Sequence, residues 1–531
     1  MQRESNTKRL IQWIGFALGP LLAGVCLLAL PDQYQAASEA SSSVSTAAPE
    51  TAGAVSTTVS EFSWAGRATL AVMVWMAVWW LTEAININAT ALLPIVLFPP
   101  LGVSDIRTAT APYADYLIFL YFGGFAIALA MERWGLGKRI ALRTLSLIGT
   151  SAPAMVAGFM LVTAVLSAFV SNTATTAMML PIAMSTIALV GKKEATDATE
   201  TNSDRDRFGT CLLLGIAYAA SVGGIMTIIG TPPNAFLIGF LQNNIAEPYR
   251  YEFTFATWLP IGVSVTAVFL PLIYLFLTRV LFPINSIELK GGKEMVRSEL
   301  SKLGRVGRGE WITLGVFSLT VVFWLTRRSL TGIGFSWNDT RIEPFAGLTD
   351  TGIAMTAALA LFMLPVNLRE RQFAMDWPTL NKMPWGILIL FGGGLSLAKA
   401  VSTNGVAEFL GSYANAVGEL PLLLTVLIVT AAIVFLTELT SNLATTTSLV
   451  PVLAAIAPGI GIHPFLLIIP ATLAASCAFM LPVATPPNAI VFGSGEISLN
   501  QMMKAGLLLN VFAIALVTLL TFCVVRPWLG I

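Results

Sequence analysis

Charged residues are scarce in this sequence. Asp, Glu, Lys and Arg make up only 11% of its 531 residues, whereas 56% are hydrophobic. A soluble globular domain carries about 25% charged residues. Apolar runs recur along the chain, and a run of roughly 20 such residues is long enough to cross a bilayer as a helix. The runs at 66–83 and 86–102 are each predicted as one span. The composition therefore predicts an all-α polytopic protein embedded in a lipid bilayer.

Histidine and cysteine are nearly absent as well. His463 is the only histidine, which removes the usual metal ligand and argues against a histidine-based catalytic relay. Cys26, Cys211, Cys477 and Cys523 stand singly in apolar segments, so neither a zinc site nor a disulfide framework is indicated. The formal net charge of +1 excludes a basic nucleic-acid binder. Because the apolar segments also lack paired carboxylates at a useful spacing, we expect neither an enzyme nor an organic cofactor.

One polar motif occurs twice in this apolar background. Hydroxyl side chains and an asparagine stand at Ser167, Ser171 and Asn172, and the same spacing returns at Thr437, Ser441 and Asn442, 270 residues later. Each copy is followed by Thr-Pro-Pro-Asn, at 231–234 and 485–488, an offset of 254 residues. Landmarks that recur in the same order at nearly constant offset indicate an internal duplication.

Each repeat also contains a candidate hairpin and a broken helix. The apolar stretches 152–190 and 420–457 are interrupted by polar residues and Pro, as expected where two half-length helices enter the membrane and return. The stretches 209–242 and 464–496 are interrupted at Thr-Pro-Pro-Asn, because Pro supplies no amide donor. Paired interruptions in two repeats mark ligand sites near the bilayer midplane. We therefore expect one central site shared by both repeats.

The duplicated motifs supply neutral oxygen ligands. Ser167 and Ser171 are four residues apart and share a helix face, and Asn172 adds a carboxamide at the helix end. Such oxygens replace the hydration shell of a hard alkali cation, together with carbonyls freed where a helix unwinds. The first predicted site consists of Ser167, Ser171, Asn172 and the Gly230 carbonyl, and the second of Thr437, Ser441, Asn442 and the Ala484 carbonyl.

The same region also offers donors to an anion. Helix ends at the breaks expose amides with partial positive charge, and no Lys or Arg lies within the motifs. The added side-chain donors are those of Asn172, Thr173, Thr231, Asn442 and Thr485. An anion bound here would need bound cations for charge balance. The alternative is that these side chains only join membrane helices, through hydrogen bonds of about 0.6 kcal/mol each; two copies favour a site.

Glu438 is an ionisable residue within the second hydroxyl motif. Carboxylates are costly inside a membrane and are functional by default. Two interpretations remain open from the sequence: Glu438 tunes a cation site, or it pairs with another polar group.

Several motifs together resemble the divalent anion/sodium symporter family, which includes dicarboxylate, citrate and sulfate carriers. The resemblance rests on the residues at 79–84 and 90–94, on Ser171-Asn172-Thr173, on 384–386 leading into 391–394, and on both Thr-Pro-Pro-Asn breaks. It covers nearly the whole chain after a Ser- and Ala-rich stretch at 31–65.

The resemblance implies an inverted repeat with about eleven transmembrane helices, two re-entrant hairpins, and a scaffold beside an elevator-type transport domain. It also implies a homodimer with a cytoplasmic N-terminus, in a plasma or inner membrane. The expected parts are a tail and first helix (1–30), a flexible external loop (31–65), the scaffold and transport parts of repeat 1 (66–145 and 146–282), a basic cytoplasmic linker (283–309), and the scaffold and transport parts of repeat 2 (310–405 and 406–531).

The family resemblance implies sodium ions at the two oxygen sites and a small dianion between them. The substrate would meet Asn172, Thr173, Thr231, Asn442, Thr485 and Pro486. We predict sodium-coupled symport of dicarboxylates such as succinate, malate or fumarate, with a sulfate or citrate symporter and a sodium-independent dicarboxylate exchanger as alternatives. Leu443 stands where many dicarboxylate carriers have Thr, which leaves the substrate class open. No Lys, Arg or His replaces a cation ligand, which favours symport over exchange.

Overall fold

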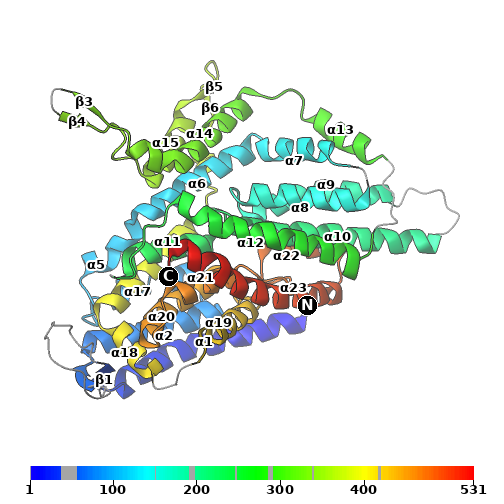
Figure 1. Cartoon of the computed structure of the whole chain (residues 1–531). Helices are drawn as coiled ribbons and strands as arrows, with labels where there is room; N and C mark the ends of the chain where they lie inside the picture. The colour runs from blue at the N-terminus through cyan, green and yellow to red at the C-terminus, as the bar shows by residue number, and fades with distance from the viewer. Residues whose placement is uncertain are drawn as a thin grey trace, which may run out of the picture.

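The computed structural model describes residues 2–37, 57–149, 151–190, 198–245, 248–284, 291–337, 340–415 and 420–531. Within these ranges the chain is mostly helical, and its strands form three separate two-stranded antiparallel hairpins (Figure 1). Nine helical segments of the described chain are long and apolar enough to cross a membrane. The prediction of an all-α polytopic membrane fold is therefore confirmed.

Among the described residues, the first half of the chain contains seventeen elements. In order they are α1 (Gln2–Ala29), β1 (Gln33–Ala37), β2 (Thr57–Glu61), α2 (Trp64–Thr82), α3 (Ile87–Thr90), α4 (Leu93–Leu97), α5 (Ile106–Thr110), η1 (Ala111–Ala114), α6 (Tyr116–Arg133), α7 (Leu136–Leu147), α8 (Ala152–Ser167), α9 (Asn172–Val190), α10 (Ala198–Ile225), α11 (Pro232–Asn244), α12 (Phe255–Leu275), η2 (Phe276–Leu281) and α13 (Gly292–Lys302).

The second half contains sixteen. They are α14 (Arg308–Thr331), β3 (Phe335–Trp337), β4 (Thr340–Ile342), α15 (Asp350–Met363), β5 (Pro365–Asn367), β6 (Gln372–Phe373), α16 (Trp377–Leu380), α17 (Trp385–Thr403), α18 (Val406–Asn415), α19 (Leu422–Thr437), α20 (Asn442–Gly459), α21 (Phe465–Ala475), α22 (Pro486–Phe492), α23 (Leu499–Leu520), η3 (Thr521–Val525) and α24 (Arg526–Leu529).

The duplication seen in the sequence is also present in the helices. The pairs α8–α9 and α19–α20 are the two predicted hairpins, and α10–α11 and α21–α22 are the two broken helices. The next helices, α12 and α23, both begin with a capping box. The amide of Thr254 lies 2.7 Å from Thr257 Oγ1, and that of Ser498 lies 2.8 Å from Gln501 Oε1. Such reciprocal caps satisfy amide donors that a helix start leaves unpaired.

Some predicted segments differ from the structure. The stretch 86–102, predicted as one span, forms two short helices, α3 and α4, with Pro94 at the start of α4. The ends of the stretch 31–65 pair as strands β1 and β2, while residues 38–56 lie outside the described residues. The linker 283–309 contains helix α13.

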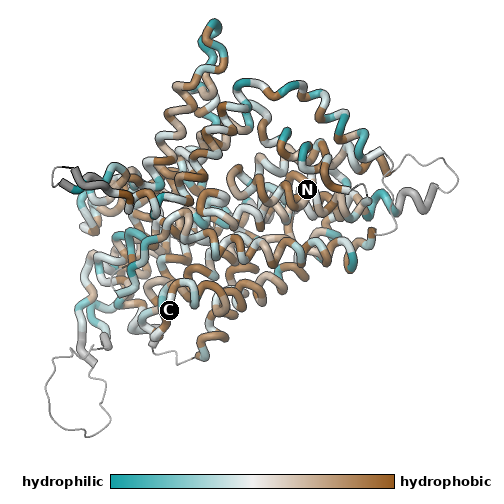
Figure 2. The backbone as a smooth tube through the Cα atoms, turned by 45° about the horizontal axis from the view of Figure 1, so that its top comes forward, coloured by the Kyte–Doolittle hydropathy of each residue, from teal (hydrophilic) through white to brown (hydrophobic). Residues whose placement is uncertain are grey.

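The two repeats cross each other at the breaks. Helix α9, the second arm of the first hairpin, packs against α22 of the second repeat, and α20 packs against α11 of the first. Helix α10 is the most enclosed span, because its apolar segment is wholly buried. Figure 2 shows hydrophobic residues along most of the helical bundle and hydrophilic residues gathered toward its margins. The crossing brings the second arm of each hairpin against the broken helix of the other repeat.

Candidate functional site

The tip of the first hairpin holds a small cluster of oxygen atoms. Helix α8 ends at Ser167 and α9 begins at Asn172. The fully buried Ser167 Oγ lies 2.6 Å from Asn172 Oδ1 and 2.8 Å from the carbonyl oxygen of Ala220 on α10. A hydroxyl carries one proton, so it can donate to only one of these two acceptors at a time. Three oxygens with one proton between them form a suitable environment for a hard cation.

The second hairpin repeats this cluster. Thr437 Oγ1, also fully buried, lies 2.8 Å from Asn442 Oδ1 and 2.9 Å from the carbonyl oxygen of Ala475 at the end of α21. The hydroxyls are 270 residues apart in the sequence and the carbonyls 255. The duplication has therefore preserved three-dimensional contacts as well as sequence spacing.

The carbonyls of Ala220 and Ala475 were missed by the sequence analysis. Gly230 and Ala484 were predicted instead because these residues immediately precede the two Thr-Pro-Pro-Asn breaks. A signal was present, since Ala-Ala-Ser occurs at 219–221 and again at 474–476, upstream of each Thr-Pro-Pro-Asn. Gly230 is nevertheless buried and lies close to the hairpin tip: a Cβ there would be 2.9 Å from the carbonyl oxygen of Ala168. The roles of Gly230 and Ala484 as cation ligands stay predictions.

The other predicted residues differ in exposure. On the hairpins, Ser171 and Thr173 are exposed, whereas Asn172, Ser441 and Asn442 are half-buried. At the breaks, Thr231, Ala484 and Thr485 are buried, and Pro486 is exposed. Thr485 Oγ1 accepts a hydrogen bond from the amide of Asn488 at the start of α22. Ser171, Thr173 and Pro486 are thus the exposed members of the predicted set.

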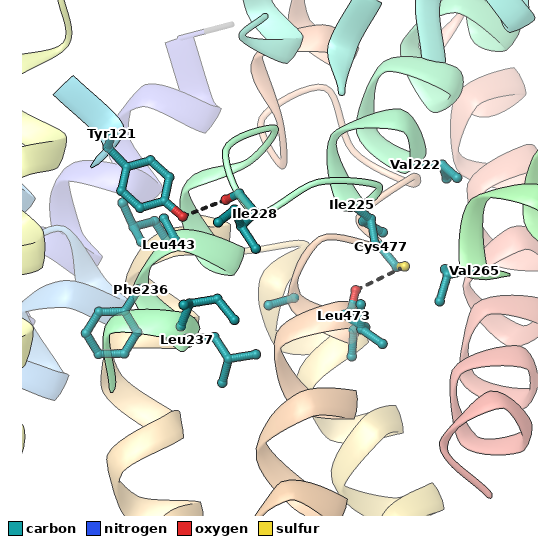
Figure 3. Close-up of a cluster of buried hydrophobic side chains, with 14 of the residues drawn as sticks. Tyr121, Val222, Ile225, Ile228, Phe236, Leu237, Val265, Leu443, Leu473 and Cys477 are labelled. Carbon is teal, nitrogen blue, oxygen red and sulfur yellow. Dashed lines mark hydrogen bonds between the residues drawn. The ribbon is translucent and has the colours of Figure 1, made fainter. Parts of the chain in front are cut away.

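Leu443 follows Asn442 and is 6% exposed. Figure 3 shows it in a buried hydrophobic cluster that also includes Tyr121 and Ile228, whose hydroxyl and carbonyl form a hydrogen bond of 2.6 Å. The leucine that replaces a hydroxyl residue therefore packs into apolar surroundings.

Glu438 binds backbone amides of the second break. Its Oε1 accepts hydrogen bonds from the amides of Phe479 and Met480 at 2.7 and 2.9 Å, and its Oε2 accepts one from Leu481 at 3.1 Å. The side-chain amide of Asn510 on α23 donates to Oε1 at 2.7 Å. The structure confirms that Glu438 pairs with polar groups, chiefly the amides of the unwound segment. An effect of its charge on a cation site stays a prediction.

The electrostatics of the region fit small ions of both signs. Helices α9, α11 and α20 begin here, and their N-termini carry partial positive charge. The part of the chain that the structure describes contains no group of three or more His, Cys, Asp and Glu residues able to hold a metal ion. Any cation bound here would consequently meet hydroxyl, amide and carbonyl oxygens.

Comparison with known proteins identifies the family. The sequence model of the sodium:sulfate symporter transmembrane region matches residues 56–530. The chain belongs to this family. It is an integral membrane protein of a transporter family, as the resemblance predicted.

Named relatives match over most of this symporter-family chain. The sodium-dependent dicarboxylate transporter SdcS of Staphylococcus saprophyticus subsp. saprophyticus is 38% identical over 535 residues, covering 100% of this chain and 94% of that protein. SdcS of Staphylococcus aureus strain USA300 is 39% identical over 470 residues, covering 88% and 87%.

A solved structure is similar in fold. The crystal structure of the YdaH transporter of Alcanivorax borkumensis, described as having an unusual topology, gives a TM-score of 0.55 over 98% of both chains at 14% identity. At this identity the similarity concerns the fold alone.

Proposed function

We propose that the protein is a sodium-coupled symporter of dicarboxylates such as succinate, malate or fumarate. The observation that carries this proposal is the duplicated oxygen cluster, in which Ser167 and Thr437 each share one proton among three oxygens. Relatives 38–39% identical to it are named sodium-dependent dicarboxylate transporters.

The coupling follows from charge balance. The two motifs contain no Lys or Arg, so a dianion between them would face only amide dipoles and hydroxyls. Sodium ions at the two clusters supply the positive charge that a dicarboxylate requires, and they order the hairpin tips that carry Asn172, Thr173 and Asn442. The substrate then binds across the tips and the breaks at Thr231, Thr485 and Pro486.

Transport proceeds by alternating access in this proposal. The hairpins and broken helices form a transport domain that moves as an elevator past a scaffold containing α2, α6, α14 and α17, in a homodimer of the plasma membrane. The basic stretch at 283–309 and the N-terminus lie in the cytoplasm, in line with the positive-inside rule. The protein's role is translocation, with sodium as the co-transported ion, and not catalysis.

Uptake of labelled succinate into proteoliposomes tests the proposal. The expected result is uptake that requires an inward sodium gradient and is blocked by unlabelled dicarboxylates. Uptake that ignores sodium but requires internal dicarboxylate would show an exchanger instead. Block by unlabelled sulfate or citrate would change the substrate assignment.

A further inference from the structure

The asparagine that ends each Thr-Pro-Pro-Asn makes the same contacts in both repeats. Asn234 Nδ2 donates to the carbonyl oxygens of Gly224, Ile225 and Thr227, at 3.5, 3.0 and 2.9 Å. Asn488 Nδ2 donates to those of Ala478 and Leu481, at 3.2 and 3.1 Å. Both side chains are fully buried. Each amide therefore joins the start of one half-helix to the unwound segment before it.

The break explains why such a donor is needed. An uninterrupted helix would satisfy these carbonyls with amides four residues further on, but the chain unwinds after α10 and α21, so those amides no longer meet them. Within the described residues, the Oδ1 atoms of Asn234 and Asn488 have no hydrogen-bond partner. The contribution of each side chain thus lies in its Nδ2 donors.

The unwound segment is also bound from its other side, by the hairpin tip. In repeat 1 the hydroxyl of Thr227 donates to the carbonyl oxygen of Ala168. In repeat 2 the amide of Leu481 donates to Glu438. Ala168 and Glu438 are 270 residues apart, and Thr227 and Leu481 are 254 apart, which are the offsets of the two motifs. The same position in each break is therefore held between the hairpin tip and the asparagine.

The first oxygen cluster packs on the last turn of α10, immediately before this segment. A Cβ on Gly224 would lie 2.6 Å from Asn172 Oδ1, so the Asn172 carboxamide packs closely on the Gly224 backbone. The carbonyl oxygen of Gly224 lies 3.5 Å from Asn234 Nδ2. A shift of the segment would consequently move the surface that positions a cluster oxygen.

We propose that Asn234 and Asn488 are positioning residues for sodium, and that each sets the sodium affinity of its own repeat by holding the break against the hairpin tip. This inference rests on the proposed sodium coupling. Neither asparagine is itself a sodium ligand in this proposal; each acts through Thr227 or Leu481 on the hairpin.

The test compares three variants in proteoliposomes: Asn234→Ala, Asn488→Ala and Thr227→Val. The valine variant keeps the volume of Thr227 and removes only its hydroxyl, so it breaks the same connection without opening a cavity. Each variant is expected to raise the sodium concentration for half-maximal succinate uptake about tenfold, the effect of losing one or two buried hydrogen bonds. At saturating sodium the KM for succinate should stay within about twofold of wild type, and choline should not substitute for sodium.

Two control variants make the same chemical changes elsewhere. Thr186→Val removes a fully buried hydroxyl that bonds only within its own helix, 2.8 Å from the carbonyl oxygen of Ile182. Asn404→Ala removes an amide at the end of α17 that donates to the carbonyl oxygen of Ala400 at 3.0 Å and to Thr69 Oγ1 on α2 at 3.2 Å. Both should leave the sodium dependence unchanged.

The outcomes separate the inference from the function it rests on. If the folded variants keep the wild-type sodium concentration for half-maximal uptake, the positioning role is overturned. Equal shifts of that concentration in the control variants would overturn it as well. A loss of uptake that saturating sodium does not restore would also overturn it. If neither asparagine variant folds, the sodium concentration for half-maximal uptake by Thr227→Val tests the positioning role. Sodium-independent uptake by the unmodified protein would instead contradict the proposed function.

Discussion

The two repeats build the same oxygen cluster but hold their helix breaks with different chemistry. In repeat 1 the contact between the hairpin tip and the break is neutral, from the Thr227 hydroxyl to the carbonyl of Ala168. In repeat 2 the corresponding tip residue is Glu438, which accepts three backbone hydrogen bonds and one from Asn510. Duplication has thus conserved the geometry of the oxygen cluster while the surrounding charge has diverged.

The divergence has an electrostatic consequence. Glu438 is 3% exposed, and none of the ion pairs among the described residues includes it. A carboxylate in low-dielectric surroundings attracts a nearby cation more strongly than it would in water. We therefore expect the second repeat to bind sodium more tightly than the first.

The largest effect is expected from removing the asparagine side chain that both clusters contain. Asn172→Ala and Asn442→Ala should each abolish sodium-dependent succinate uptake, because each deletes the Oδ1 of its cluster and a donor to the substrate. Uptake by purified, monodisperse protein in proteoliposomes checks this, with Asn404→Ala as the control. Full activity in either variant would contradict a site shared by both repeats.

The next variant removes the carboxylate charge that distinguishes repeat 2 from repeat 1. Glu438→Gln should raise the sodium concentration for half-maximal uptake by about tenfold or more, because it deletes the buried charge and turns an acceptor of the Leu481 amide into a donor. Sodium titration of succinate uptake measures the change.

Glu496→Gln is the matched control for that variant. It neutralises a carboxylate that pairs with Arg205 at 2.7 Å, where the Arg205 side chain is 37% exposed. It should leave the sodium titration unchanged, since exposed pairs contribute little. An equal shift in both variants would show that Glu438 has no special effect on sodium.

A smaller effect should distinguish the clusters themselves. Ser167→Ala and Thr437→Val each remove the hydroxyl of one cluster. We expect Ser167→Ala to raise the sodium concentration for half-maximal uptake about tenfold and Thr437→Val to raise it about threefold. The second shift is smaller because the charge of Glu438 still attracts sodium in repeat 2. The reverse order of the two shifts, measured in the same titration, would contradict the electrostatic comparison.

The smallest effect concerns Leu443. Leu443→Thr should change the ratio of succinate to sulfate uptake by about threefold or less. It should also lower the unfolding temperature, because the threonine hydroxyl would enter the apolar cluster of Figure 3. Competition assays and thermal unfolding in detergent measure the two quantities. A large change in anion preference would show that residue 443 faces the substrate.

The sequence was most informative where polar residues and prolines interrupt apolar runs. The hairpins at 152–190 and 420–457 and the Thr-Pro-Pro-Asn breaks were found because such interruptions are costly in a membrane unless they line a site. The carbonyls of Ala220 and Ala475 were missed because the repeated Ala-Ala-Ser marks the region but not the contact, and which carbonyl a hydroxyl meets depends on how two helices pack.

Glu438 shows another limit of sequence reasoning. From its position in the hydroxyl motif, Glu438 could tune a cation site or pair with another polar group, and the sequence favours neither. The polar pairing depends on where the amides of Phe479, Met480 and Leu481 lie, and these amides become available only because the helix unwinds after Ala475. The split of the predicted span at 86–102 likewise depends on local chain geometry around its prolines.

The central claim is that the two oxygen clusters bind sodium and act together on one substrate. The most direct measurement is the initial rate of labelled succinate uptake by proteoliposomes over a range of external sodium concentrations. We expect a sigmoidal dependence, as two cooperating sodium sites require. A rate that does not change with sodium would contradict the claim.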